Sequence, residues 1–147
     1  MMTLLIVCLG PACFTKLRVH RNRTHTFELK LAEAKMSDGL VEQAVADSGE
    51  KIYLHKEAII TADDIDDANA TQDGRGGYQV NVRFSADGAR KMEKATGENI
   101  SKRLAIIFDG KVRSAPTIQS PISSACNITG AFTRESAEDL AKALRGD

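Results

Sequence analysis

Several groups of side chains in this sequence have the types that chemistry requires, and the acidic run TADDIDDAN is the densest of them. Its carboxylates have the charge for a divalent cation, but the run lacks the oxygen-ligand spacing and the central glycine of a calcium loop. We therefore interpret it as the start of a short helical turn. Thr61 would cap that turn, and Asp63 and Asp64 would lie at the positive end of the helix dipole.

Nucleophilic and phosphate-binding patterns are also incomplete. Four serines surround two prolines: Ser114, Ser120, Ser123 and Ser124. None of them belongs to a Gly-x-Ser-x-Gly or Ser-x-x-Lys pattern, and the histidines that could activate a serine are distant in sequence. The segment DGRGGYQ lacks the Lys and Ser/Thr of a phosphate loop, which favours a flexible turn. Asp109 precedes Gly110, so we interpret it as a turn former rather than a catalytic carboxylate.

The three cysteines, Cys8, Cys13 and Cys126, form no Cys-x-x-Cys pair, and no two histidines have ligand spacing, so a zinc site is not expected. Cys126 has small neighbours and no nearby basic residue, which favours a small buried hydrophobe over a nucleophile. The residues thus predict no catalytic, cofactor-binding or metal-binding residue, no cofactor and no enzyme.

The amino-acid composition argues against nucleic acid as a partner. The chain has 147 residues with 20 Lys plus Arg against 20 Asp plus Glu, so it has no global positive field to attract nucleic acid. Aromatic residues make up only 5% and Trp is absent, which argues against stacking on single-stranded nucleic acid. The length suits one domain with its own core.

The first 25 residues differ in composition from the rest. MMTLLIVCLGPACF is apolar but, at about a dozen residues, is too short to cross a bilayer as a helix. It has the length of the apolar core of a secretory signal, but no Lys or Arg precedes it. Two interpretations therefore stay open: that this segment directs export, or that the start codon is set too late and a longer leader has been clipped. The following KLRVHRNRTH is a basic linker, or a segment that contacts anionic lipid. We divide the chain into 1–25, a leader-like apolar segment and basic linker, and a domain at 26–147.

Period-two alternation predicts most of the strands. FELKL and YQVNVRF alternate apolar and polar residues, with Tyr78, Val80, Val82 and Phe84 pointing inward, and KIYLHKEAII predicts a strand over 51–60. A short strand is expected over 40–45 within an otherwise irregular connection. CNITGAF predicts a strand with a bulge at Gly130, and DANATQD is expected only to lead into the glycine-rich turn.

Two helices are expected. Ser85 would cap one that extends to about Lys102, with Ala89, Met92, Thr96 and Ile100 on one face and a bend or fray at Gly97. Thr133 would cap the other, which ends at Gly146 and has its apolar stripe at Ala137, Leu140, Ala141 and Leu144.

The span RLAIIFDGKVRSAPTIQSPI predicts a hairpin. LAIIF has the uninterrupted apolar character of a central strand covered on both faces, and Asp109-Gly110 is a preferred pair for a two-residue turn. Alternation resumes at 111–113, and Pro116 and Pro121 end the pairing because neither can donate a ladder hydrogen bond. The fold class is therefore α+β: an antiparallel or mixed β-sheet with two main helices packed on one face.

Three stretches, LHKEAIITADDIDDA, FSADGARKMEKATGENISKRLAIIFDGKVRSAPTIQSPI and ITGAFTRESAEDLAKALRGD, resemble the head subdomain of the first periplasmic domain of the protein-export membrane protein SecD. The family's motifs fall at Thr61 to Ala68, Gly88 to Lys91, Asn99 to Ile106, Asp109 to Ile118 and Ile128 to Gly146. The resemblance covers about two-thirds of the chain, from near Lys51. SecD-like proteins have six membrane helices and intramembrane carboxylates, and this chain has no segment of ~20 apolar residues.

The resemblance implies an extracytoplasmic, non-catalytic module that contacts unfolded or translocating polypeptide, or another envelope protein, during Sec-dependent export. Peptide capture could occur by strand addition at a sheet edge near the prolines after Lys111. The alternative is a sensory or regulatory domain that binds a small molecule or a partner in a cleft between sheet and helices. Membrane association through the N-terminal segment is a further interpretation. The family's peptide-contacting surface has no motif that assigns site residues here.

Overall fold

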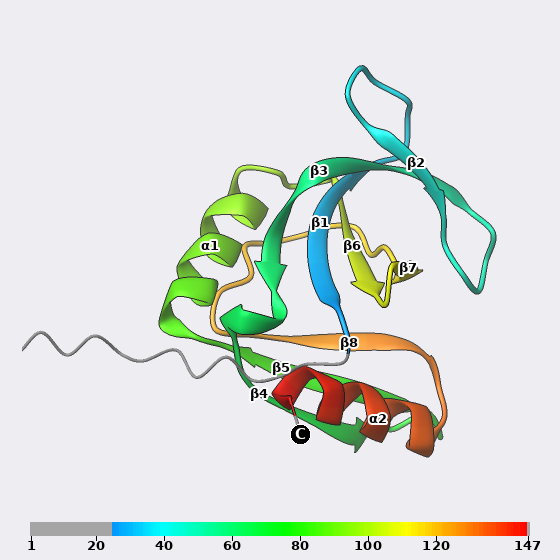
Figure 1. Ribbon diagram of the computed structural model, residues 1–147, viewed down its shortest axis with the longest axis vertical. Coiled ribbons are helices and arrows are strands. Elements are labelled where there is room, and N and C mark those ends of the chain that lie inside the picture. Colours follow the sequence, from blue (N-terminus) through cyan, green and yellow to red (C-terminus); the bar gives the residue numbers. More distant parts are fainter. Residues whose placement is uncertain (1–24, 147) are drawn as a thin grey trace, which may run out of the picture.

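The computed structural model describes residues 25–146, so all but the last residue of the proposed leader-like segment and linker at 1–25 lies outside the described residues (Figure 1). The expected α+β class is confirmed. The chain forms its elements in the order β1 (Phe27–Glu33), β2 (Val41–Ala44), β3 (Lys51–Thr61), a 3-10 turn (Ala62–Asp64), β4 (Ile65–Gln72), β5 (Tyr78–Phe84), α1 (Ala86–Gly97), β6 (Arg103–Phe108), β7 (Lys111–Ser114), β8 (Ala125–Phe132) and α2 (Arg134–Arg145).

Five strands form the larger sheet, in the order β2-β3-β1-β6-β7. All of its pairings are antiparallel, and β1 is central, with β3 on one side and β6 on the other. The strands expected at 27–31, 40–45, 51–60 and in LAIIF are confirmed. The four residues from Leu104 to Ile107 are all buried, as expected for a strand covered on both faces.

The two edges of the larger sheet meet at one end. Val45, just after β2, forms a parallel bridge with Val112 of β7, and the N–H of Ala46 donates to the carbonyl oxygen of Val112 at 2.8 Å. A small cluster of eight buried apolar residues includes both members of this bridge: Ala32, Val45, Ile52, Leu54, Ala105, Ile107, Val112 and Ala115. Pairing and burial together protect these edges from further strand addition at this point.

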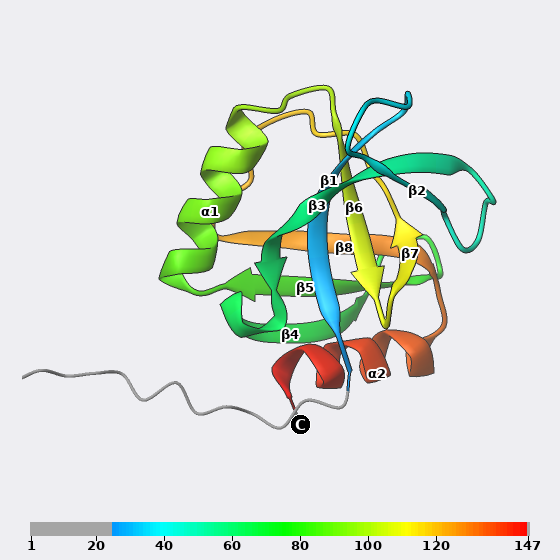
Figure 2. The ribbon, with the colours of Figure 1, turned by 45° about the horizontal axis from the view of Figure 1, so that its top comes forward.

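The smaller sheet has the strand order β4-β5-β8, and its strands cross those of the larger sheet (Figure 2). α2 packs mainly on β4 and β5, with its predicted stripe of Ala137, Leu140, Ala141 and Leu144 buried. Thr133 accepts a hydrogen bond from the N–H of Ser136, and Gly146 ends the helix at φ 77°, both as expected. A large apolar cluster, which includes Ile128 and Met92, joins both sheets and both helices.

The distribution of strands over two sheets differs from the single sheet we expected. DANATQD, expected only as an approach to a turn, lies largely within β4, which pairs with β5 from Ile65 to Gln72. The strand was missed because its apolar residues, Ile65, Ala68 and Ala70, are interrupted by a register shift between Ile65 and Asp67. A bulge breaks the period of two on which the prediction depended.

Helix α1 is shorter than expected. Ser85 caps it as predicted, accepting a hydrogen bond from the N–H of Gly88, but the helix ends at Gly97 rather than near Lys102. Ile100, expected on its buried face, is 42% exposed. Thr96 is fully buried, donates to the carbonyl oxygen of Met92 and accepts from the N–H of Ile122. These bonds fix the helix end against the loop that precedes β8.

Candidate functional site

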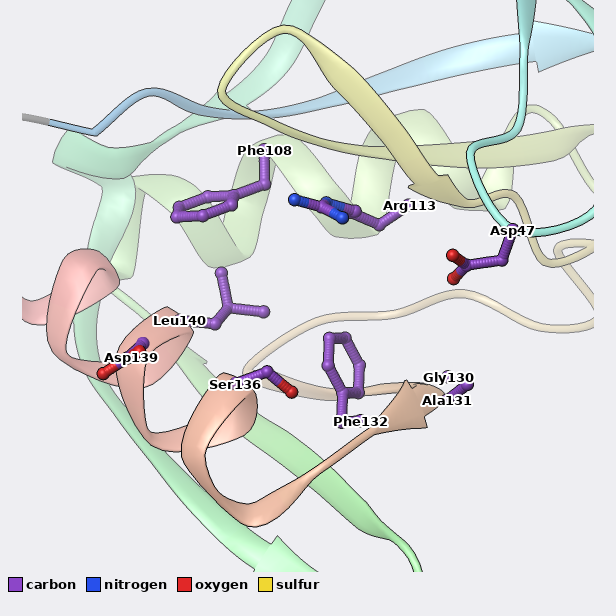
Figure 3. Close-up of a pocket in the computed structure, with 9 residues that line it drawn as sticks. All are labelled: Asp47, Phe108, Arg113, Gly130, Ala131, Phe132, Ser136, Asp139 and Leu140. Atoms are coloured by element: carbon purple, nitrogen blue, oxygen red, sulfur yellow. The ribbon is translucent and has the colours of Figure 1, made fainter.

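A pocket of about 300 Å³ lies where the β6–β7 hairpin faces β8 and the first turns of α2 (Figure 3). Segments distant in sequence contribute its lining, which is mixed in character: Asp47, Phe108, Arg113, Gly130, Ala131, Phe132, Ser136, Asp139 and Leu140. Sequence reasoning singled out Leu140 only as a core residue, and it assigned no pocket function to Phe108 or Phe132. Only the packing of the two sheets brings these residues together.

The apolar part of the pocket comes from three elements. Phe108 ends β6, Phe132 ends β8, and Leu140 lies in α2. The two phenyl rings and the leucine side chain point into the same space (Figure 3). Both phenylalanines are half-buried and pack at the margin of the large apolar cluster. The pocket therefore offers apolar and aromatic surface that a side chain of moderate size could cover.

One wall of the pocket is the edge of a sheet. Within the described residues 25–146, β8 has β5 as its one neighbouring strand, so its other side has no partner strand. Tyr78 pairs with Phe132 and Val80 with Ile128, so two residue steps on β5 match four on β8. The predicted bulge around Gly130 is thus confirmed, and Thr129, Gly130 and Ala131 are exposed. An exposed edge offers main-chain donors and acceptors to an extended chain.

The outer edge of β7 does not offer the site that we expected near the prolines after Lys111. Its Val112 carbonyl oxygen already accepts from the N–H of Ala46. Farther along, Leu104 donates to the carbonyl oxygen of Pro116, and Thr117 bridges to Arg103. The last two contacts are with β6, so the outer edge is engaged within the domain at Val112. β8, which borders the pocket, is therefore the other location for strand addition.

The turn that carries Phe108 is fixed by its neighbours. Asp109 and Gly110 have φ values of 49° and 77°, which confirms the predicted two-residue turn. One oxygen of the Asp109 carboxylate accepts from the N–H of Thr26 at 2.9 Å, the other lies 2.8 Å from Nδ1 of His25, and the His25 ring stacks on Phe108. The hydrogen bond with His25, followed by the one with Thr26, lowers the pKa of Asp109.

The other sequence candidates have structural partners. Asp64 is buried, its carboxylate lies 2.8 Å from Nζ of Lys91, and it accepts from the N–H of Thr61, so the expected helical turn is confirmed. His55 pairs with Glu33 rather than with any of the serines. Burial raises the pKa of the Cys126 thiol to about 12. Across the part of the chain that the structure describes, no three metal-ligating side chains gather.

The comparisons with known proteins agree with one another. The family model for the SecDF P1 head subdomain matches residues 38–147. The chain belongs to this family. It is 41% identical over 114 residues to the protein translocase subunit SecD of Magnetococcus marinus, and the alignment covers 74% of this chain but 22% of that protein. With the SecD of Elusimicrobium minutum it shares 45% identity over 63% of this chain and 20% of the relative.

Solved structures show the same fold. A SecDF crystal structure in a super-membrane-facing form matches at a TM-score of 0.68 and 26% identity, covering 84% of this chain and 19% of that one. A second, described as a membrane component SecDF that enhances protein export, matches at 0.67 and 25% identity over 84% of this chain and 63% of that chain. The chain spans about a fifth of the length of the curated relatives named above. None of the helices between residues 25 and 146 is long and apolar enough to cross a bilayer.

Two of the SecD motifs of the sequence now have a physical explanation. Thr61 and Asp64 belong to one motif and Gly88 and Lys91 to the next, and they meet where the 3-10 turn touches α1. Gly88 packs so tightly on Asp64 that a Cβ built on it would lie 2.6 Å from the Asp64 carbonyl oxygen. These four residues position the elements and lie outside the pocket, whereas Phe132 and Leu140, in the last motif, line it.

Proposed function

We propose that this head subdomain is a non-catalytic, extracytoplasmic polypeptide-binding module that contacts unfolded or translocating chains during Sec-dependent export. Membership of the SecDF family supports the association with export, since the relatives are protein translocase subunits. The domain would comprise residues 26–147, and 1–25 would precede it as a leader-like segment and linker.

The observation that carries the proposal is the coincidence of an unpaired strand edge with an apolar pocket. β8 presents exposed backbone at Thr129, Gly130 and Ala131, and the space between Phe108 and Phe132 adjoins it. Main-chain hydrogen bonds to a sheet edge give affinity for any extended chain, whereas a side-chain pocket adds selectivity. A folded protein has few extended segments available for such pairing, so this site would favour unfolded substrates.

Site-specific photocrosslinking tests the proposal. We would place a benzophenone amino acid at Ala131, beside the pocket, and in a matched variant at Glu93, which is exposed on α1. The full chain would be mixed with a secretory protein held unfolded by reduction, or with the same protein folded. We expect crosslinks from position 131 to the unfolded form, and far fewer from position 93 or to the folded form.

Other results would contradict the proposal. Equal crosslinking from positions 93 and 131 would indicate adhesion without a site. An absence of crosslinks to any unfolded chain, combined with saturable binding of a small molecule or one folded envelope protein, would support the sensory alternative. Circular dichroism of both variants would establish that the crosslinker leaves the fold intact.

A further inference from the structure

Arg113 is the basic side chain in the wall of the pocket, and among residues 25–146 it has no ion-pair or hydrogen-bond partner. It lies on β7, is half-buried and lines the pocket with its guanidinium end toward Phe108 (Figure 3). Among residues 25–146, no carboxylate lies within 4.0 Å of its guanidinium, and it makes no hydrogen bond through its side chain. A half-buried guanidinium loses part of its hydration, and a partner that accepts its hydrogen bonds would restore that loss.

The other arginines in the described part of the chain differ from Arg113. Arg75 is exposed in the β4–β5 turn, and Arg145 donates to the carbonyl oxygen of Ala68. The remaining four form ion pairs: Arg83 with Asp67, Arg90 with Asp87, Arg103 with Glu50, and Arg134 with Glu138. The pair of Arg103 with both oxygens of Glu50 shows the arrangement that a guanidinium adopts when a carboxylate is available.

The nearest acidic side chains do not satisfy Arg113. Both oxygens of Asp109 are used by His25 and Thr26, and the charge of Arg113 is only a minor cause of the lowered pKa of that carboxyl. Asp139 directs its carboxyl away from the centre of the pocket, and Asp47 is exposed on the loop after β2 (Figure 3). A carboxylate that entered the pocket beside Phe108 would therefore meet a free cation in partly apolar surroundings.

We propose that Arg113 makes this site selective for extended polypeptide segments that carry an Asp or Glu two residues from an apolar side chain. The inference rests on the proposed polypeptide-binding function. Residues i and i+2 of a strand lie on the same face, so both side chains of such a segment would face the pocket when it pairs with β8. The apolar side chain would occupy the space between Phe108 and Phe132, and the carboxylate would accept hydrogen bonds from Arg113.

Fluorescence anisotropy with three labelled peptides tests this selectivity on the full chain. The peptides share a Thr/Ser host sequence with one Phe and differ only at the residue two positions later, which is Asp, Asn or Lys. We expect the Asp peptide to bind about tenfold more tightly than the Asn peptide, and the Lys peptide to bind most weakly. Added salt should reduce the difference between Asp and Asn because it screens the charge interaction.

Protein variants identify the residue responsible. Arg113→Gln should bind the Asp and Asn peptides equally, and Arg113→Lys should retain a smaller preference because a lysine keeps the charge but not the planar guanidinium. Lys56→Gln removes an exposed charge of the same sign on β3 and should leave the preference unchanged.

The outcomes separate the two proposals. Equal affinity of the wild-type chain for all three peptides overturns the role of Arg113 and leaves the polypeptide-binding function standing. A preference that survives in Arg113→Gln also overturns it. If none of the peptides binds saturably, the proposed function fails, and the selectivity that depends on it fails too.

Discussion

The two sheets of this domain differ in how their edge strands are paired. In the five-stranded sheet the edge strands are brought together by the Val45–Val112 bridge and the Ala46 hydrogen bond, and a small apolar cluster lies behind that contact. In the three-stranded sheet the edge strands are β4 and β8, and within residues 25–146 β8 has no second neighbouring strand and borders a pocket that contains two phenylalanines. An unpaired edge presents main-chain donors and acceptors with which another chain can pair. Both sheets contribute to the large apolar cluster, and under the proposed function the smaller one would also provide the contact surface.

Removing one buried isoleucine from each sheet gives the largest expected effect and compares the two apolar clusters behind the sheets. Ile52 and Ile128 are both fully buried, the first in the small cluster and the second in the large one. Truncation to alanine costs about 2–5 kcal/mol, and the cost is greater where the surroundings cannot relax into the cavity. We expect Ile128→Ala to be the more destabilising in urea unfolding, because Ile128 belongs to the cluster shared by both sheets and both helices. Equal losses would contradict the distinction between the clusters.

The contact between α1 and the 3-10 turn, which links the two sheets, can be tested with two glycines of one helix. A Cβ at Gly88 would meet the Asp64 carbonyl oxygen at 2.6 Å, whereas at Gly97 its nearest neighbour would be Cγ of Pro121 at 3.8 Å. We expect Gly88→Ala to lower the free energy of unfolding by about 1–3 kcal/mol because backbone must move. Gly97→Ala is the matched control, with a change of at most about 1 kcal/mol in the stabilising direction. Thermal or urea unfolding measures both.

The turn beside the pocket should contribute stability that depends on pH. Its hydrogen bonds lower the pKa of Asp109 in the folded state below the ordinary value of 3.8. A carboxyl with a depressed folded pKa contributes stability above its unfolded pKa, and the contribution disappears as the pH falls through the lower folded value. Asp109→Asn should therefore be less stable than wild type at pH 6, by no more than about 1 kcal/mol because the pair is exposed.

Unfolding curves of the two proteins between pH 2.5 and 6 would measure that effect. The difference should narrow as the pH falls below about 4. A difference that is constant across the range would indicate that the asparagine disturbs the turn for reasons unrelated to charge.

Thiol reactivity gives the smallest expected signal, because Cys126 of β8 should hardly react in the native state. Burial raises its pKa to about 12, so little thiolate is present at pH 8. In a variant with Cys8→Ser and Cys13→Ser, Ellman's reagent should modify Cys126 quickly in urea and very slowly without it. Fast native labelling would show that the smaller sheet opens readily, and it would weaken the view that β8 is a preformed edge.

Features that depend on neighbouring residues were predictable from the sequence. All four members of the α2 stripe are buried, because the spacing of Ala137 through Leu144 fixes one face of a helix. The Asp109–Gly110 turn is likewise a property of two adjacent residues. The end of α1 was not predictable in this way, since it depends on Thr96 bonding to Ile122, which lies 26 residues later.

The candidate site was less predictable than the elements that form it. Phe108 and Phe132 each follow a recognised strand pattern, but their common pocket requires the two sheets to pack together. The hypothesis of strand addition placed the contact near the prolines, because nothing local to Lys111 indicates that Ala46 has already engaged β7. Among the arginines of residues 25–146, Arg113 is the one that lines this pocket without a partner, and that combination depends on the rest of the fold.

The central position of β1 has a consequence for how the domain is assembled in time. β1 pairs with β3 and with β6, whose last residue, Phe108, lies opposite Phe27. A chain that emerges amino-terminus first can pair β1 with β3 early, but its second neighbour, β6, follows only after more than half of the polypeptide has emerged. Such long sequence separation slows folding. During that interval the half-built sheet would itself expose an unpaired strand to the surrounding solution.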